Sequence, residues 1–188
     1  MATFINYYPC SYGDSFVAMF SGKLIARKNN LITVSNGEFK QIAFYQQHPN
    51  TQQQQLSQLV DGIYSCHRQY QFDFSPHRVV SIKLDFTNFL PTRFKKIQVD
   101  QMKKTFANPV IAQLEKKLTF EQLVNFDYVS WSKKNIFTTD IELPLSLIYN
   151  KPALKNFCAQ YNFVFNEAQV DDIVTDIENY NETLSRLV

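Results

Sequence analysis

The chain has 188 residues, of which 45% are hydrophobic and 19% charged, and it contains seventeen Phe and ten Tyr. This composition predicts one folded domain over residues 1–188 and excludes a disordered or linker-rich chain. The net charge of +2 is too small to predict nucleic acid as a partner. No apolar run approaches the roughly 18 residues that a membrane span requires, so we expect no such span.

The cysteines favour a reducing compartment. Cys10, Cys66 and Cys158 are odd in number and form no CxxC pair, so neither a disulfide framework nor a zinc site is predicted. The first residues also lack a basic segment followed by an apolar stretch. We therefore expect a cytoplasmic protein; export into the cytosol of another cell by a specialised machine stays open.

The first 22 residues predict a strand, a loop and a helix. Residues 3–8, "TFINYY", combine β-branched and aromatic side chains and stop at a proline, which cannot donate to a sheet ladder. After the loop, residues 16–20 are mainly apolar and predict a short helix. Asp14 or Ser15 is suited to cap its start, and Gly22 is suited to end it.

The next stretch predicts a hairpin, a helix and a second strand. Asn36 and Gly37 stand between two β-rich runs, and this dipeptide suits the positive φ angles of a type I′ turn. Apolar residues at helical spacing predict a helix from about Thr51 to Tyr64. Residues 78–86, "RVVSIKLDF", predict a mostly buried strand, which we expect beside the first one.

The second half of the chain predicts mainly helices. From Asn108 onward the pattern is helical, Pro152 opens one of the last helices, and another begins at about Glu167. The whole pattern predicts an α/β fold with a central, mostly parallel sheet, flanking helices, a β-hairpin insertion and a helical C-terminal part.

The loop between the first strand and the first helix is suited to hold an anion. Backbone N–H groups point out of a helix N-terminus, where they can bind a phosphate or a sulfate. Gly13 would let the backbone approach that anion closely, and Ser11 and Ser15 could add hydroxyl donors. An ordinary strand-to-helix turn is the plain alternative. A triphosphate P-loop is not predicted, because no Gly-Lys-Ser/Thr ending follows Gly13.

At this point the sequence resembles the small, divergent members of the P-loop sulfotransferase superfamily. The segment "YPCSYGDSF" is similar to the opening loop of these proteins. The residues that match the pattern of that loop are Tyr8, Pro9, Ser11, Gly13, Ser15 and Phe16. The segment "DIELPLSLIYNKPALKNFCAQYNFVF" looks like their closing segment. The sequence departs from the pattern at Cys10, where many relatives carry Lys, at Tyr12, which looks inserted, and at Asp14, which adds a negative charge.

The resemblance implies a nucleotide-binding transferase. It would move a sulfuryl group from 3′-phosphoadenosine 5′-phosphosulfate to the hydroxyl of an unknown acceptor, with the loop around the 5′ end of the donor. Lys83 and Arg93 are the candidates for the 3′-phosphate. His67 is the candidate base for the acceptor hydroxyl, because a neutral imidazole titrates near working pH, and His48 and His77 are weaker candidates. A structural or solvated role is the plain alternative for each of these residues.

Two other classes of function stay open. A cysteine protease or deubiquitinase would use Cys10 as nucleophile, activated beside a helix start, with His67 or His77 as base. A non-enzymatic interaction protein would contact its partner through exposed aromatic residues and the basic segment 91–104, which contains Lys95, Lys96, Lys103 and Lys104. Capture of one partner in a salt-sensitive manner, without nucleotide binding, would favour the interaction protein.

Overall fold

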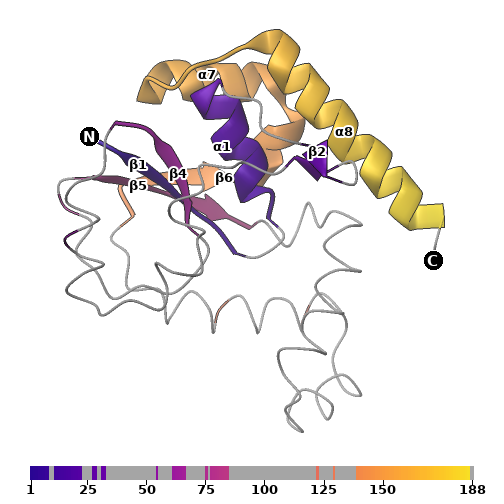
Figure 1. Cartoon of the computed structure of the whole chain (residues 1–188), viewed down its shortest axis with the longest axis horizontal. Helices are drawn as coiled ribbons and strands as arrows, with labels where there is room; N and C mark the ends of the chain where they lie inside the picture. Colours follow the sequence, from indigo (N-terminus) through magenta and orange to yellow (C-terminus); the bar gives the residue numbers. More distant parts are fainter. Residues whose placement is uncertain are drawn as a thin grey trace, which may run out of the picture.

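A four-stranded parallel sheet lies at the centre of the described structure (Figure 1). The computed structural model describes residues 1–8, 11–22, 27–28, 31–32, 61–66, 77–84 and 139–186, together with Gln54, Ser75, Gln122 and Val129. In spatial order, the strands of the sheet are β4 (Ile63–Cys66), β1 (Thr3–Asn6), β5 (Arg78–Lys83) and β6 (Ile141–Pro144). The predicted α/β fold with a mainly parallel sheet is confirmed.

Strand β1 has a neighbour on each side. Thr3 pairs with Ile63 of β4 and with Arg78 of β5, and Val80 of β5 pairs with Ile141 of β6. The expected pairing of the strand that starts at residue 78 with the first strand is therefore confirmed. Counted in chain order, the four parallel strands run 2-1-3-4 across the sheet. The strand order consequently reverses at the boundary between β1 and β5.

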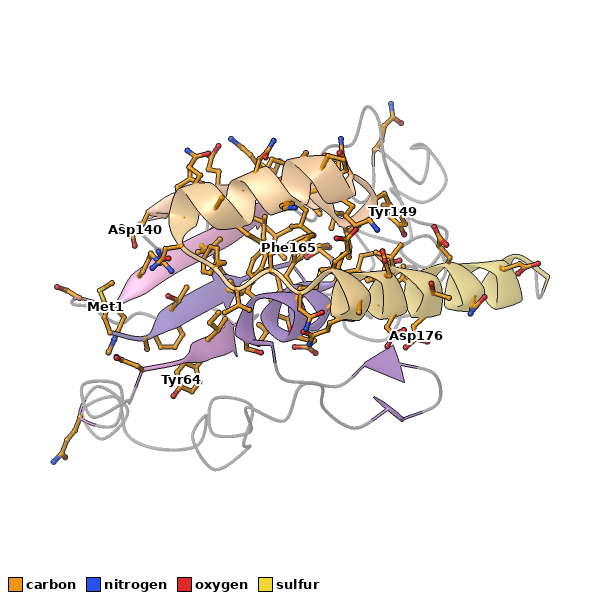
Figure 2. The ribbon with its side chains drawn as sticks, turned by 90° about the horizontal axis from the view of Figure 1, so that it is seen from above. Met1, Tyr64, Asp140, Tyr149, Phe165 and Asp176 are labelled. Carbon is orange, nitrogen blue, oxygen red and sulfur yellow. The ribbon has the colours of Figure 1, made fainter. Side chains whose placement is uncertain are left out.

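The helices of the described residues lie on one side of this sheet (Figure 1): α1 (Gly13–Ser21), α7 (Lys151–Tyr161) and α8 (Glu167–Arg186). Helix α1 packs on β1 and β4, and α8 packs against α1. A 3-10 helix, η1 (Leu145–Tyr149), connects β6 to α7. The predicted helical C-terminal part is confirmed. Met1 and Asp140, which precede β1 and β6, lie at the same end of the sheet, as parallel strands require (Figure 2).

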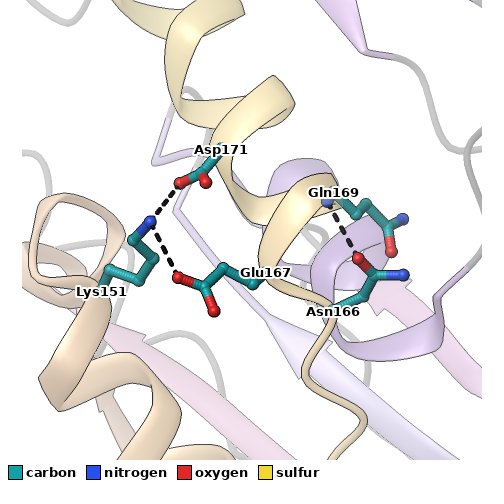
Figure 3. Close-up of polar contacts among 5 residues, drawn as sticks. All are labelled: Lys151, Asn166, Glu167, Gln169 and Asp171. Carbon is teal, nitrogen blue, oxygen red and sulfur yellow. Dashed lines mark hydrogen bonds and ion pairs between the residues drawn. The ribbon is translucent and has the colours of Figure 1, made fainter.

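Asparagine side chains begin both C-terminal helices. Asn150 Oδ1 accepts a hydrogen bond from Ala153 N at 3.1 Å. Asn166 Oδ1 accepts one from Gln169 N at 3.1 Å (Figure 3). Each bond satisfies one of the backbone donors that a helix start leaves without a helical partner. Lys151 at the start of α7 forms ion pairs with two acids of α8, Glu167 and Asp171 (Figure 3).

The core lies between the helices and the sheet. Ile5, Val80 and Ile141 are paired across three strands and point to the helical face, where α1 and α8 pack. Phe20 of α1 is buried among aromatic rings and lies 4.5 Å, centroid to centroid, from Phe163 and 6.1 Å from Phe157. Burial of these rings joins the N-terminal helix to the C-terminal part.

Arg78 joins the same C-terminal part to the amino end of the sheet. Its Nε donates to Thr3 Oγ1 at 3.2 Å, and its Nη1 donates to the carbonyl oxygen of Tyr161, at the end of α7, at 3.0 Å. The guanidinium also lies 4.6 Å from the ring centroid of Phe163. A cation at a helix C-terminus is favoured by the helix dipole, so the contact stabilises the end of α7.

Several predicted boundaries need correction. Strand β1 ends at Asn6, two residues before the predicted end, and β5 ends at Lys83 rather than at residue 86. The predicted helix from Thr51 to Tyr64 is wrong at its end, because Ile63 and Tyr64 belong to β4. Pairing with β1 decides the conformation of these two residues, which are also good strand formers.

Two further differences concern strands. Strand β6 lies within the part predicted to be mainly helical, and its side chains alternate between buried and exposed. The described antiparallel pair consists of β2 (Arg27–Lys28) and β3 (Leu31–Ile32), so their connection is residues 29–30. The turn predicted at Asn36 and Gly37 lies outside the described residues.

Cys158 provides a test of the C-terminal packing. Its thiol lies on the buried face of α7 with Leu154 and Phe157, and burial raises its pKa from 9.0 to about 11. The unfolded chain therefore loses this proton at lower pH than the folded one, so this thiol lowers stability as the pH rises from 9 through about 11.

In a variant with Cys10 and Cys66 changed to Ser, we expect a thiol-reactive dye to label Cys158 only on unfolding. Rapid labelling of the folded protein would contradict this packing.

Candidate functional site

The carboxyl ends of β1 and β5 define the candidate site. In open parallel sheets, ligands bind outside the carboxyl ends of the strands, in the crevice where the strand order reverses. Here the reversal falls between β1, which ends at Asn6, and β5, which ends at Lys83. The chain leaves β1 at this edge and enters α1 at Gly13. The loop predicted to bind an anion thus lies at the edge where the topology favours a ligand.

A chain of three polar side chains starts at this boundary and continues past β5 to Thr139, which lies two residues before β6. Asn6 Nδ2 donates to Ser81 Oγ at 3.2 Å, and Ser81 Oγ lies 2.8 Å from Thr139 Oγ1. Asn6 and Ser81 are register partners, and both point to the face opposite to the helices, because Ile5 and Val80 point toward them. We call Asn6, Ser81 and Thr139 the polar chain.

One atom of the polar chain lacks a hydrogen-bond partner within the part of the chain that the structure describes. Asn6 is only 5% exposed, and its Oδ1 is buried without a partner among the described residues. Most buried polar atoms in proteins are hydrogen-bonded, so an acceptor of this kind needs a physical explanation. A water molecule or a ligand atom that donates a hydrogen bond would satisfy it.

Lys83 brings a positive charge to the same edge. Its Nζ donates to Glu142 Oε2 at 2.5 Å, and both side chains are more than half exposed, at 58% and 60%. An exposed ion pair of this kind stabilises a protein by only about 0–1 kcal/mol. Lys83 can therefore exchange Glu142 for a phosphate at little cost in stability.

The loop after β1 is closed by a tight turn. The carbonyl oxygen of Tyr8 accepts hydrogen bonds from Ser11 N at 3.0 Å and from Ser11 Oγ at 2.6 Å. Ser11 is fully buried, and its hydroxyl proton is used by this turn. Tyr12, with φ 57° and ψ 25°, takes the left-handed conformation before α1. Ser15 is buried in the first turn of α1.

Gly13 makes room for an aromatic ring. A Cβ atom at this position would overlap the ring of Tyr7, so only glycine fits beneath that ring. The hydroxyl of Tyr7 donates to Asp14 Oδ1 at 3.0 Å. The sequence suggested that the missing side chain admits a phosphate, but the Tyr7 ring occupies this space. The first turn of α1 also holds the carboxylate of Asp14, which the helix dipole favours there.

One further predicted residue, His77, is described by the structure, and it is not at this edge. His77 lies before β5, at the amino end of the sheet, where its Nδ1 accepts a hydrogen bond from Ala2 N at 3.3 Å. Its ring also packs edge-on against Phe4, with centroids 5.6 Å apart. The structure therefore gives His77 contacts far from the loop after β1. Several other predicted residues lie outside the described residues: Cys10, His48, His67 and Arg93, with the lysines of segment 91–104.

The polar chain was not predicted from the sequence. A local signal exists, because Asn6 ends the otherwise apolar run "TFIN" and Ser81 interrupts the apolar run "RVVSIK". A polar residue at the end of a buried strand is a usual feature of ligand sites in parallel sheets. The pairing that joins Asn6 to Ser81 spans 75 residues, however, and no local pattern gives it.

Comparison of the chain with protein-family models, with curated proteins and with solved structures finds no match. Within the described ranges, no group of three or more His, Cys, Asp or Glu is placed to hold a metal ion. The helices of this part of the chain also lack the combination of length and apolarity that crossing a bilayer requires. The fold defines an α/β protein with a parallel sheet, and the resemblance to sulfotransferases stays a prediction.

Proposed function

We propose that this chain binds a nucleotide at the carboxyl edge of its parallel sheet, over the boundary between β1 and β5. The observation that carries the proposal is the Asn6–Ser81 hydrogen bond of the polar chain, which joins β1 to β5 where the strand order reverses. Lys83 adds a cation on the same edge for a phosphate.

The reaction that we propose for this site is sulfuryl transfer from 3′-phosphoadenosine 5′-phosphosulfate to an acceptor hydroxyl. It is favoured by the loop that the resemblance singled out, because this loop starts at the carboxyl end of β1 and turns directly into α1. Asp14 would repel a second anion at the start of α1. The described residues therefore support nucleotide binding more directly than they support the reaction.

Adenosine 3′,5′-bisphosphate, the nucleotide that sulfuryl transfer would leave, is the ligand to test. At a concentration 100 times the dissociation constant, a ligand stabilises the folded state by about 2.7 kcal/mol. For a chain of this size we expect the melting temperature to rise by about 5–10 °C. Differential scanning fluorimetry with millimolar nucleotide measures this rise.

Two lysine variants separate binding at this edge from general charge effects. Lys83→Gln should reduce the rise in melting temperature, because it removes the cation from the edge. Lys151→Gln is the matched control, since Lys151 is also an ion-paired surface lysine but joins α7 to α8. A melting temperature that does not change with the nucleotide would contradict the proposed function. Equal losses in the two variants would contradict the proposed place of binding.

A further inference from the structure

We infer that the side-chain oxygen of Asn6 binds a ribose hydroxyl of the nucleotide, so that the site prefers ribonucleotides to deoxyribonucleotides. The inference rests on the proposed function, because it names the part of the ligand that meets the polar chain. It starts from the one atom of that chain that lacks a partner among the described residues, Asn6 Oδ1.

The nitrogen of the Asn6 amide holds this side chain in place through a hydrogen bond. Its Nδ2 is directed at Ser81 Oγ, whose own neighbour is Thr139 Oγ1 at 2.8 Å. The carbonyl end of the amide is left buried without a donor among the described residues. A buried acceptor in this state lowers stability, and a ligand that donates a hydrogen bond removes this penalty.

The chemistry of the polar chain selects a hydroxyl among the groups of a nucleotide. An amide oxygen can only accept, so it cannot bond to the oxygens of an ionised phosphate, which are also acceptors. The donors of a nucleotide are its ribose hydroxyls and the amino groups of its base. A hydroxyl can donate to Asn6 Oδ1 and also accept from the one hydroxyl of the Ser81–Thr139 pair whose proton is not used within that pair, whereas an amino group can only donate.

Charge supports the same assignment. Asn6, Ser81 and Thr139 are all neutral, whereas Lys83 is the cation that the described residues place at this edge. A neutral sugar suits the polar chain, and a phosphate suits Lys83. Because the 3′-hydroxyl of adenosine 3′,5′-bisphosphate is phosphorylated, its 2′-hydroxyl is the ribose hydroxyl that remains free. We therefore assign the 2′-hydroxyl to Asn6.

Isothermal titration calorimetry with adenosine 3′,5′-bisphosphate and its 2′-deoxy analogue tests the assignment on the full chain. The wild type should bind the deoxy analogue roughly 10- to 100-fold more weakly, because that analogue leaves Asn6 Oδ1 buried without a donor. Asn6→Leu should bind both nucleotides with nearly equal, weaker affinity. Asn6→Asp keeps an acceptor oxygen at the same place and should retain a preference for the ribonucleotide.

The melting temperature of the free protein distinguishes a binding role from a structural role. Asn6→Leu removes a buried acceptor that has no partner among the described residues and also removes the hydrogen bond to Ser81, two changes of opposite sign, so its melting temperature should stay within about 4 °C of the wild type. Gln169→Leu is the control, because the buried Gln169 Nε2 does have a partner, the carbonyl oxygen of Ala18 at 3.1 Å. This control should lower the melting temperature and leave the preference for the ribonucleotide unchanged.

The outcomes separate this inference from the proposed function. Equal affinity of the wild type for the two nucleotides would overturn the inference and leave nucleotide binding in place. A preference that survives in Asn6→Leu, or a melting temperature that falls by more than about 4 °C in that variant, would also overturn it. If the wild type binds neither nucleotide, both the inference and the proposed function are wrong.

Discussion

Replacement of Phe20 by alanine is expected to lower the free energy of unfolding by about 3–5 kcal/mol, the usual range for a buried phenylalanine. Phe20 is 1% exposed and is stacked on Phe163 at 4.5 Å. It also lies 5.7 Å from Phe16 of its own helix. The variant would leave a cavity between α1 and the C-terminal helices, because rings on two sides lose their common neighbour.

Urea unfolding followed by circular dichroism measures this loss. Val164→Ala is the control, since Val164 directly follows Phe163 in the chain but is 55% exposed. We expect that control to change the free energy of unfolding by no more than about 0.5 kcal/mol. A loss below about 1 kcal/mol for Phe20→Ala would mean that α1 does not pack against the C-terminal part as described.

Replacement of Gly13 by alanine is expected to lower the free energy of unfolding by about 1–3 kcal/mol, the usual cost of overpacking. Alanine is a better helix former than glycine, so helix propensity alone predicts the opposite sign. We expect a loss of stability despite this propensity, because the new Cβ would overlap the ring of Tyr7. To avoid this overlap the ring must move, and its hydrogen bond to Asp14 is then lost.

A double-mutant cycle tests this explanation directly. Tyr7→Ala alone should destabilise the protein, because Tyr7 is buried. Adding Gly13→Ala in that background should cost nothing further or raise stability, since the ring is gone and helix propensity then decides the sign. If the two losses simply add, Gly13 is not required by Tyr7.

The parts of the fold that the sequence predicted are those decided by local patterns. The first strand, the end of α1 at Gly22 and the start of α7 beside Pro152 follow from apolar spacing and from residues that end or begin helices. The cap predicted at Asp14 or Ser15 is wrong, because α1 begins at Gly13 without a side-chain cap and both residues lie in its first turn. The start of β4 and the whole of β6 depend instead on pairing with β1 and β5, which are distant in the chain. Helical spacing at residues 56–63 could not reveal this pairing, because Ile63 fits either pattern.

In the candidate site too, local patterns predict one part, and contacts between distant residues decide the rest. The position of the loop after β1 could be predicted, because a strand, a turn and a helix follow one another in the chain. The role of Gly13 could not be predicted, because it depends on the direction of the Tyr7 ring, and many side-chain arrangements fit the same loop sequence. The polar chain could not be predicted either, because Asn6 is 75 positions from Ser81 and Ser81 is 58 positions from Thr139.

The most direct test of nucleotide binding at the carboxyl edge is a ¹H–¹⁵N NMR titration of the full chain with adenosine 3′,5′-bisphosphate. We predict the largest shifts at the backbone amides of Asn6, Tyr7, Ser81 and Lys83, which lie where β1 and β5 end. The amide of His77, at the other end of the sheet, should change little. Largest shifts near His77 or on α7 and α8, or no shifts at millimolar nucleotide, would contradict this account.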